Sequence, residues 1–313
     1  MSEYSYHFTD ETEKKAFAAL CEAEFRARLQ EIAAIAATRE GLRFITLAGP
    51  TCSGKTTTAG ILIDKLESIG RRVVVISLDD FFYDRAYLMA EAQRSGVPFD
   101  MDSVKAIDLD ALRAFVADLF DGKTSVLPRF DFQEGKRMVG DTVVPHPEDV
   151  YLFEGIQAVY PEVTALFPRS AVLSLYISVE ETIVTPDGLW LPREIRLLRR
   201  LLRDSKFRST DAETTFAHWG GVTRNELRSI EPYKDACDHR IDSAMPYELC
   251  VLKEPLMTLL ATVDEGDDHA VTARLLAEKL SRLPAFDEAY VPADSVLREF
   301  IGPSQSTKER TTP

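Results

Sequence analysis

The chain has 313 residues, of which 45% are hydrophobic and 28% charged, and its formal net charge is −14. These are the proportions of an ordinary globular protein, and the negative charge argues against binding to nucleic acid or to an anionic membrane. Four scattered cysteines predict neither a disulfide framework nor a zinc site. Without a leader or a run of 18 apolar residues, we expect a reduced, cytoplasmic protein.

Residues 10–38 contain neither Gly nor Pro and are rich in Ala, Glu, Leu and Arg, which predicts one or two amphipathic helices. Their apolar side chains form stripes within residues 17–25 and 29–35. We expect residues 1–40 to be a helical extension packed on the domain that follows, with a partner-binding helix as the alternative.

The next stretch carries the strongest motif of the sequence. Residues 42–48 form a short apolar segment that predicts a buried strand, and residues 56–69 have apolar side chains at helical spacing. Between them lies the phosphate-loop pattern Gly-x4-Gly-Lys-Thr, formed by Gly49, Pro50, Thr51, Cys52, Ser53, Gly54, Lys55, Thr56 and Thr57. A glycine-rich turn with a chance Lys-Thr is the structural alternative.

Such a loop between a strand and a helix points its backbone N–H groups at phosphate oxygens. Lys55 would reach the β- and γ-phosphates, and the hydroxyl of Thr56 would be a ligand of Mg²⁺. We therefore predict that the chain binds a nucleoside triphosphate, ATP.

A second predicted strand, residues 72–78, ends in two acids, Asp79 and Asp80. In open parallel sheets functional groups gather at the carboxyl ends of the strands. Asp79 is the best candidate for the base that accepts the proton of an attacking hydroxyl, and Asp80 is its rival. Either acid could instead only form a turn, since Asp is common after strands.

Further along, residues 84–106 read as a loop and a short helix with a break at 96–100, and residues 109–119 as a helix. Residues 124–132 read as extended, with Phe130 and Phe132 on one side, either in the core or stacked on a substrate. A third strand, 150–153, ends at Glu154, which we expect to hold Mg²⁺ directly or through water. A fourth strand covers 171–177, so strands alternating with helices predict an α/β fold with a parallel sheet.

Residues 190–208 are rich in arginine and predict an amphipathic helix. Its basic face holds Arg193, Arg196, Arg200 and Arg203, and the opposite face holds Leu191, Ile195, Leu198 and Leu202. A solvated cationic face is the alternative, but in an acidic protein with a phosphate loop we favour a phosphate-facing lid over about 190–225. Residues 211–301 look mostly helical, with strand-like pieces at 239–241 and 249–252, and the polar residues 303–313 predict a disordered tail.

Several motifs follow one another in a specific order: residues 49–57, 77–81, 99–100, 127–132, 152–156 and 199–204. Together they resemble the uridine kinase and phosphoribulokinase family of P-loop kinases over residues 42–260. Residues 185–188, 207–208, 243–253 and 294–302 further resemble a bacterial uridine kinase-like nucleoside kinase subgroup. Members of that subgroup often carry an extra N-terminal module, and this chain resembles a short form.

The resemblance implies a five-stranded parallel core with helices on both sides, a mobile lid, and transfer of the γ-phosphate of ATP to the 5′-hydroxyl of a nucleoside. It implies that Asp79 is the base, that Asp100 holds the ribose hydroxyls and that Glu154 is associated with Mg²⁺. It also implies that Phe130 and Phe132 line the base pocket, and that lid arginines touch phosphates, namely Arg200, Arg203 and Arg208.

The sequence departs from the family pattern in two places. Pyrimidine kinases of the family place a histidine that reads the base where this chain has Gly135, and Arg137 is a candidate to face the substrate instead. Residues 181–192 are extra length before the arginine helix.

Two alternatives to a nucleoside kinase stay open. One is a phosphoribulokinase-like kinase for a sugar or sugar phosphate, with Lys136 and Arg137 as a second cationic site. The other is an ATP-binding regulatory protein without turnover. In each case the partner is a small molecule, and a homo-oligomer stays open.

Overall fold

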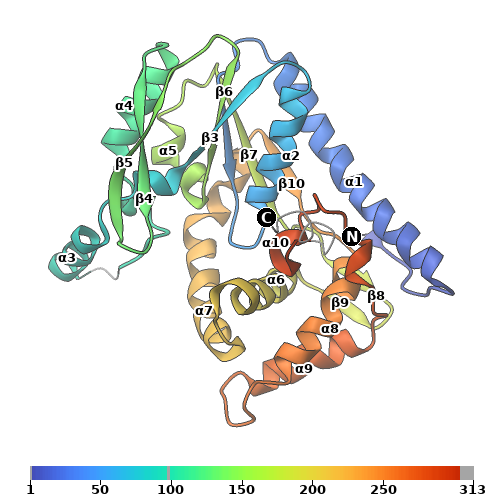
Figure 1. Ribbon diagram of the computed structural model, residues 1–313. Coiled ribbons are helices and arrows are strands. Elements are labelled where there is room, and N and C mark those ends of the chain that lie inside the picture. Colours follow the sequence, from blue (N-terminus) through green and yellow to red (C-terminus); the bar gives the residue numbers. More distant parts are fainter. Residues whose placement is uncertain (1, 97–98, 304–313) are drawn as a thin grey trace, which may run out of the picture.

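The computed structural model describes residues 2–96 and 99–303 of the chain. At its centre is a five-stranded parallel sheet with strand order β10-β7-β2-β6-β3 (Figure 1). The strands are β2 (Phe44–Ala48), β3 (Arg72–Ser77), β6 (Asp149–Glu154), β7 (Val172–Ser178) and β10 (His239–Asp242). The predicted α/β fold with a parallel core is confirmed. Residues 97–98 of the predicted break, and all of the predicted tail except Pro303, lie outside the described residues.

Alternating side chains of these strands divide the core into two halves, one on each face of the sheet. In β2, Ile45 and Leu47 belong to one cluster of buried side chains, and Phe44 belongs to the other. The first cluster also holds residues of α1 (Glu11–Thr38) and α2 (Lys55–Glu67), and the second holds residues of α4 (Leu109–Phe120) and α5 (Pro161–Thr164). In Figure 1 these two pairs of helices lie on opposite sides of the sheet.

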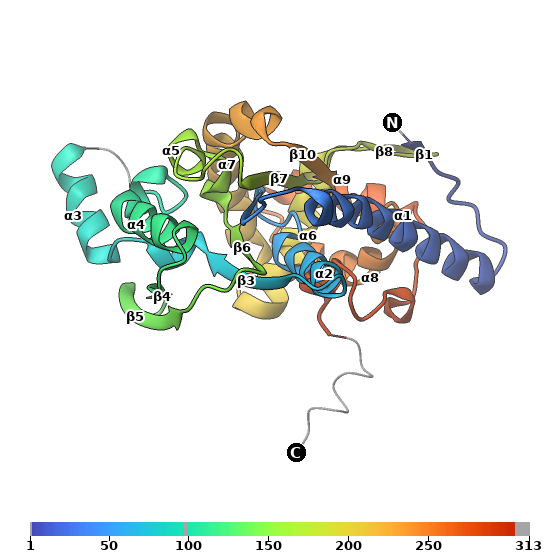
Figure 2. The ribbon, with the colours of Figure 1, turned by 90° about the horizontal axis from the view of Figure 1, so that it is seen from above.

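The remaining elements surround the carboxyl ends of the strands. A hairpin of β4 (Ser125–Asp131) and β5 (Lys136–Val143) lies with α3 (Arg85–Ser95) toward one end of the molecule (Figure 2). Toward the other end lie α8 (Glu248–Leu260) and α9 (Ala270–Ser281), and between the two ends run α6 (Pro192–Arg208) and α7 (Ala212–Ser229). The short α10 (Arg298–Ile301) contacts α6 (Figure 1). In the described parts of the chain, none of the helices is long and apolar enough to cross a membrane.

The N-terminal helix is a single element of 28 residues. Asp10 begins it by accepting hydrogen bonds from the backbone N–H groups of Thr12 and Glu13. Its buried side chains, Phe25 and Leu29 among them, lie in the same cluster as β2. The extension therefore packs on α2 and on the sheet edge at β10, while its first turns contact Phe286 and Tyr290.

The predicted extra segment is also ordered. Residues 183–190 form a hairpin of β8 (Ile183–Thr185) and β9 (Gly188–Trp190), and β8 pairs in parallel with β1 (Ser2–Glu3). Trp190 at its end is fully buried. The hairpin ends at Trp190, and α6 begins two residues later, at Pro192.

One secondary-structure prediction was wrong. Residues 249–252 were expected to be strand-like, but they form the first turn of α8 after Glu248. All four side chains are buried, at 1% exposure or less. A short, uniformly apolar run has no periodicity with which to distinguish a buried helix from a buried strand.

Candidate active site

The phosphate loop connects β2 to α2 and has the backbone that its sequence predicts. Gly54, which begins α2, has a φ of 88°, a left-handed conformation that glycine adopts without strain. At Gly49 a Cβ atom would lie 2.2 Å from the carbonyl oxygen of Ile177, so a side chain would collide with β7. These two glycines let the loop curl closely over the end of the sheet.

Lys55 is folded back across this loop. Its Nζ donates hydrogen bonds to the carbonyl oxygens of Gly49, at 2.9 Å, and Pro50, at 3.1 Å. Burial lowers the pKa of Lys55, while the carboxylates of Glu154, Glu299 and Asp79 act in the opposite direction. Lys55 therefore lies near three acids that are far apart in the sequence.

Asp79 lies in the one-turn 3₁₀ helix Leu78–Phe81 that follows β3. Burial, and then the charge of Glu154, raise the pKa of Asp79 to about 6, and Lys55 opposes this shift. Proton acceptors of phosphoryl transfer work best when their pKa lies near the operating pH. The structure therefore gives Asp79 the surroundings of a group that can exchange a proton near neutrality.

The rival acid, Asp80, has a different position. Its Oδ1 accepts a hydrogen bond of 2.9 Å from the backbone N–H of Phe130. This contact ties the hairpin strand β4 to the turn after β3. Asp80 is therefore engaged in the fold, and Asp79 is the acid that is close to Lys55 and Glu154.

Glu154 is the last residue of β6, and its neighbours in the sheet explain its place in the site. It is in register with Leu47 of β2 on one side and with Ser77 of β3 on the other. Because β6 lies between those strands, Glu154 lies between the start of the phosphate loop and Asp79.

The oxygen donors here fit Mg²⁺. The hydroxyl of Thr56, which is exposed, and the carboxylate of Glu154 are hard ligands of the kind that Mg²⁺ prefers. Among the described residues, there is no group of three or more His, Cys, Asp or Glu side chains that could hold a metal by themselves. In nucleotide sites, Mg²⁺ is typically held by one or two protein oxygens together with phosphate oxygens.

A second acidic pair lies beside this centre. Asp100 accepts a hydrogen bond of 3.0 Å at Oδ1 from the backbone N–H of Asp102. Burial, and then the charge of Asp100, raise the pKa of Asp102, and Lys55 and Arg200 act in the opposite direction. Asp102 therefore faces the phosphate loop and the arginine helix.

The loop that carries these two acids is fixed by its neighbours. Gln157 Nε2 donates to the carbonyl of Met101 at 3.1 Å, and the hydroxyl of Tyr160 donates to the carbonyl of Asp102 at 2.8 Å. Asn225 of α7 reaches the carboxylate of Asp102 at 3.5 Å. Sequence reasoning missed Asp102, whose place two residues after Asp100 was a usable signal. It also missed Asn225, for which the sequence offers no local signal.

The three residues expected to line the pocket for the nucleobase lie in different surroundings in the structure. Phe130 is 4% exposed and contacts the rings of Phe82 and Phe132 edge-on, whereas Phe132 is 57% exposed near the tip of the hairpin. Arg137 donates to the carboxylate of Asp108 at 2.9 Å, at the start of α4. The guanidinium of Arg137 is therefore engaged on the α4 side of the hairpin.

Gly135, at the position of the base-reading histidine, has a φ of 66°, and a Cβ there would lie 2.9 Å from Cβ of Arg85. A side chain at this position would therefore be strained as well as crowded. The backbone N–H of Arg85 also donates to the carbonyl of Gly135, which holds this turn against the start of α3.

Three arginines of α6 gather around the buried carboxylate of Asp204. Arg200 and Arg208 lie 3.1 and 3.3 Å from it, and Arg203 lies 3.8 Å from it. Arg203 also donates to the hydroxyl of Thr51 in the phosphate loop, at 3.0 Å. Arg208 is the most exposed of the three, with 55% of its side chain accessible.

The expected basic face of α6 needs a correction, because Arg196 is not available on it. Arg196 is 3% exposed and makes a two-point ion pair with Glu226 of α7, at 2.7 and 2.5 Å. Arg199, which was not placed on that face, is fully buried and makes a similar pair with Glu248 of α8. Leu191 is 51% exposed rather than part of the apolar face, because it precedes the first helical residue.

A phosphate loop between a central parallel strand and a helix, with acids at the ends of the next strands, defines the class of P-loop nucleotide-binding proteins. The model of the phosphoribulokinase / uridine kinase family matches residues 44–248. The chain therefore belongs to the phosphoribulokinase / uridine kinase family and is a P-loop kinase.

Individual relatives agree with this assignment. A uridine kinase from Staphylococcus epidermidis is 29% identical over 195 residues, which cover 62% of this chain and 84% of that protein. A uridine kinase from Schizosaccharomyces pombe is 31% identical over 173 residues, 54% of this chain and 33% of that protein. Among solved structures, a proposed fructose transport system kinase from Silicibacter sp. TM1040 has a TM-score of 0.51 at 18% identity, covering 72% of this chain and 98% of that one. The last comparison supports the fold.

Proposed function

We propose that this kinase uses ATP and Mg²⁺ to phosphorylate the 5′-hydroxyl of a nucleoside. The observation that carries the proposal is the position of Asp79, which is partly buried near Lys55 and Glu154 and has its pKa raised to about 6. A pure nucleotide-binding protein has no need of such a proton acceptor beside its phosphate loop. The similarity to uridine kinases supports a nucleoside as acceptor.

In the proposed reaction, Asp79 accepts the proton of the acceptor hydroxyl while the hydroxyl oxygen forms a bond to the γ-phosphorus. The bond between that phosphorus and the β,γ-bridging oxygen breaks, and ADP leaves. Lys55, Arg200 and Arg203 stabilise the charge on the migrating group, and Thr56 and Glu154 hold Mg²⁺. The backbone from Gly49 to Thr57 cradles the phosphates, with Arg208 as a further contact.

On the acceptor side, Asp100 and Asp102 supply oxygens that accept hydrogen bonds from vicinal hydroxyl groups, as on a ribose. Phe132 is the exposed aromatic that could stack on a base, and Phe130 supports it from the core. Arg137 is assigned a supporting role, since its guanidinium is bound to Asp108.

A neutral sugar is the second candidate acceptor. Two observations favour it: Gly135 provides no side chain to read a base, and Asp100 and Asp102 recognise hydroxyl groups whatever the rest of the molecule. A phosphorylated sugar fits less well, because these acids would repel its phosphate and Arg137 is already paired.

The test is ATP consumption with Mg²⁺ against a panel of nucleosides and neutral sugars, with Asp79→Asn as control. Stimulation by one nucleoside that is lost in the variant supports the proposal. Stimulation only by a sugar keeps the mechanism and replaces the acceptor. ATP binding without stimulation by any compound in the panel would instead favour a regulatory protein.

A further inference from the structure

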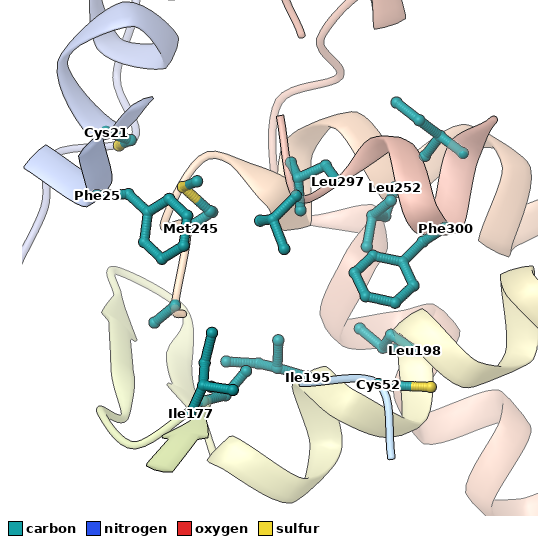
Figure 3. Packing of buried hydrophobic residues seen from close by; sticks show 14 of the residues in the cluster. Cys21, Phe25, Cys52, Ile177, Ile195, Leu198, Met245, Leu252, Leu297 and Phe300 are labelled. Atoms are coloured by element: carbon teal, nitrogen blue, oxygen red, sulfur yellow. The ribbon is translucent and has the colours of Figure 1, made fainter. Parts of the chain in front are cut away.

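The C-terminal segment 293–302 lies outside the residues that the family model matches, and it returns to the phosphate loop. Val296 is fully buried, and its Cγ2 lies 2.2 Å from the position that a Cβ on Gly54 would take. Phe300 and Leu297 of this segment join the same apolar cluster as Leu198 of α6 and Cys52 of the phosphate loop (Figure 3). A part of the chain that the family pattern does not cover therefore packs against the loop for ATP.

Polar contacts anchor this segment at both ends. At its start, Asp294 pairs with Arg26 of α1 at 2.6 Å. At its end, Lys206 of α6 donates to the carbonyl of Ile301 at 3.0 Å. Between them, Arg298 donates to the carbonyls of Pro292, at 3.1 Å, and Glu288, at 3.0 Å. The position of its side chains relative to the phosphate loop is therefore set independently of any nucleotide.

Glu299 is the side chain that this segment presents to the phosphate-binding cations. Its Oε1 lies 3.5 Å from Nη1 of Arg203, whose Nη2 donates to the hydroxyl of Thr51. Its Oε2 is buried and, within the described residues, has no hydrogen-bond partner. Nε of Arg203 is likewise buried and without a hydrogen-bond partner in residues 2–96 and 99–303.

The charge of Glu299 also acts on Lys55, second only to that of Glu154 among the acids that raise the pKa of this lysine. A carboxylate therefore stands beside Lys55 and Arg203, two of the cations to which the proposed function assigns the triphosphate. ATP brings several negative charges to the same place, and like charges at close range in a partly buried site repel strongly.

We propose that Glu299 is an internal counter-ion of Arg203 that the triphosphate of ATP displaces, so that the C-terminal segment competes with ATP for this arginine and weakens its binding. The inference rests on the proposed function only in taking ATP as the ligand of the phosphate loop. Before ATP binds, Glu299 adds a second negative charge beside Arg203, whose other carboxylate neighbour, Asp204, is shared with Arg200 and Arg208. When ATP binds, the phosphate takes over the guanidinium and Glu299 turns away from it.

The experiment is calorimetric titration of the full-length protein and of Glu299→Gln with Mg²⁺–ATP. Glutamine keeps the size of the side chain and removes its charge, so we expect ATP to bind roughly threefold to tenfold more tightly to the variant at low ionic strength. The gain should shrink in about 0.5 M salt, because added ions screen the repulsion. An unchanged or weaker affinity in Glu299→Gln would overturn the inference.

Glu288→Gln is the matched control. The carboxylate of Glu288 pairs with Lys206 at 3.5 Å, and 45% of its side chain is exposed. This variant should bind ATP as the unchanged protein does, and an equal gain in both variants would reduce the effect to general surface charge and so refute the role of Glu299. A protein that does not bind ATP at all would refute the proposed function instead, so the two failures are distinguishable.

A double variant provides the second readout. In an Arg203→Gln background, the substitution Glu299→Gln should no longer tighten ATP binding, because the competition is for that arginine. The same tightening with and without Arg203 would show that Glu299 acts elsewhere and would contradict the proposal.

Discussion

Nη2 of Arg203 lies 3.0 Å from the hydroxyl of Thr51, so an arginine of α6 is hydrogen-bonded to the phosphate loop, 152 residues away in the sequence. Two arginines earlier in the helix also donate to this loop, Arg196 to the carbonyl of Thr51 and Arg199 to that of Cys52, and they have a second role. Arg196 and Arg199 are buried in ion pairs that hold α6 against α7 and α8. The basic helix therefore combines an internal clamp with an arginine cluster beside the phosphate loop, formed by Arg200, Arg203 and Arg208 around Asp204.

The clamp predicts a large loss of stability when one partner is removed. Glu248→Gln leaves Arg199 fully buried and without its ionic partner, which should lower the free energy of unfolding by roughly 3–5 kcal/mol. Urea unfolding monitored by circular dichroism measures this loss. A loss below about 1 kcal/mol would mean that the pair is not a structural clamp.

For Arg203, in the cluster beside the phosphate loop, we expect the opposite: a large loss of activity with a small loss of stability. Arg203→Gln should lower kcat by roughly a hundredfold, because a positioned cation no longer stabilises the migrating phosphoryl group. The midpoint of thermal unfolding should fall much less than in Glu248→Gln, since the ionic contacts of Arg203 are 3.5 Å or longer, whereas those of Arg199 are 2.6 and 2.8 Å. A collapse of stability together with activity would make Arg203 a structural residue.

Asp79→Asn should reduce turnover by roughly a hundredfold or more and leave ATP affinity nearly unchanged, because it removes only the proton acceptor. Because burial raises the pKa of Asp79 to about 6, ionisation of this carboxyl lowers the stability of the folded state, and this cost is fully present above about pH 6. The variant should therefore be at least as stable as the unchanged protein at pH 8.

Asp80→Asn is the matched control for this substitution. Its amide oxygen can still accept the hydrogen bond from the backbone of Phe130, so most turnover should be retained. A larger loss of turnover in Asp80→Asn than in Asp79→Asn would move the base to Asp80.

The dependence of the rate on pH should report the same group. A base must be ionised to accept a proton, and the pKa of Asp79 is raised to about 6. The logarithm of kcat/KM should therefore fall with a slope of about 1 as the pH drops below 6, and should be level above pH 7. Rates measured from pH 5 to pH 8 at constant ionic strength test this, and a profile without a break between pH 5 and pH 7 would contradict it.

Much of the fold, and the residues that surround the phosphate loop in the candidate site, could be predicted from the sequence, because both depend on local patterns. The strands are short apolar runs, Asp79 and Glu154 stand at the ends of two of them, and Lys55 belongs to the glycine-rich pattern that follows a third. Pairing over long distances could not be predicted in this way. Arg196 forms an ion pair with Glu226 and Arg199 forms one with Glu248, at separations of 30 and 49 residues. A helical pattern shows which arginines share a face, but it does not show which of them meets a buried acid.

At the edge of the sheet, next to β10, Asp238 should make the stability of the fold depend on pH. Asp238 just before this strand accepts hydrogen bonds from Arg169 and from the backbone and hydroxyl of Ser174 in β7. Burial alone would raise the pKa of Asp238, but these hydrogen bonds lower it to about 2. A carboxyl with a lower pKa in the folded state adds stability above its unfolded pKa of about 3.9, and this stability is lost as the pH falls toward 2.

Asp238→Asn should therefore lower the free energy of unfolding by roughly 2 kcal/mol at pH 7 and by about half as much at pH 3. Urea unfolding at both pH values measures the difference. Asp235→Asn is the control, because Asp235 is 73% exposed in its pair with Arg240, and it should change stability by less than about 0.5 kcal/mol. A loss in Asp238→Asn that is the same at both pH values would show that the hydrogen-bond geometry of Asp238, and not its charge, joins β10 to the sheet.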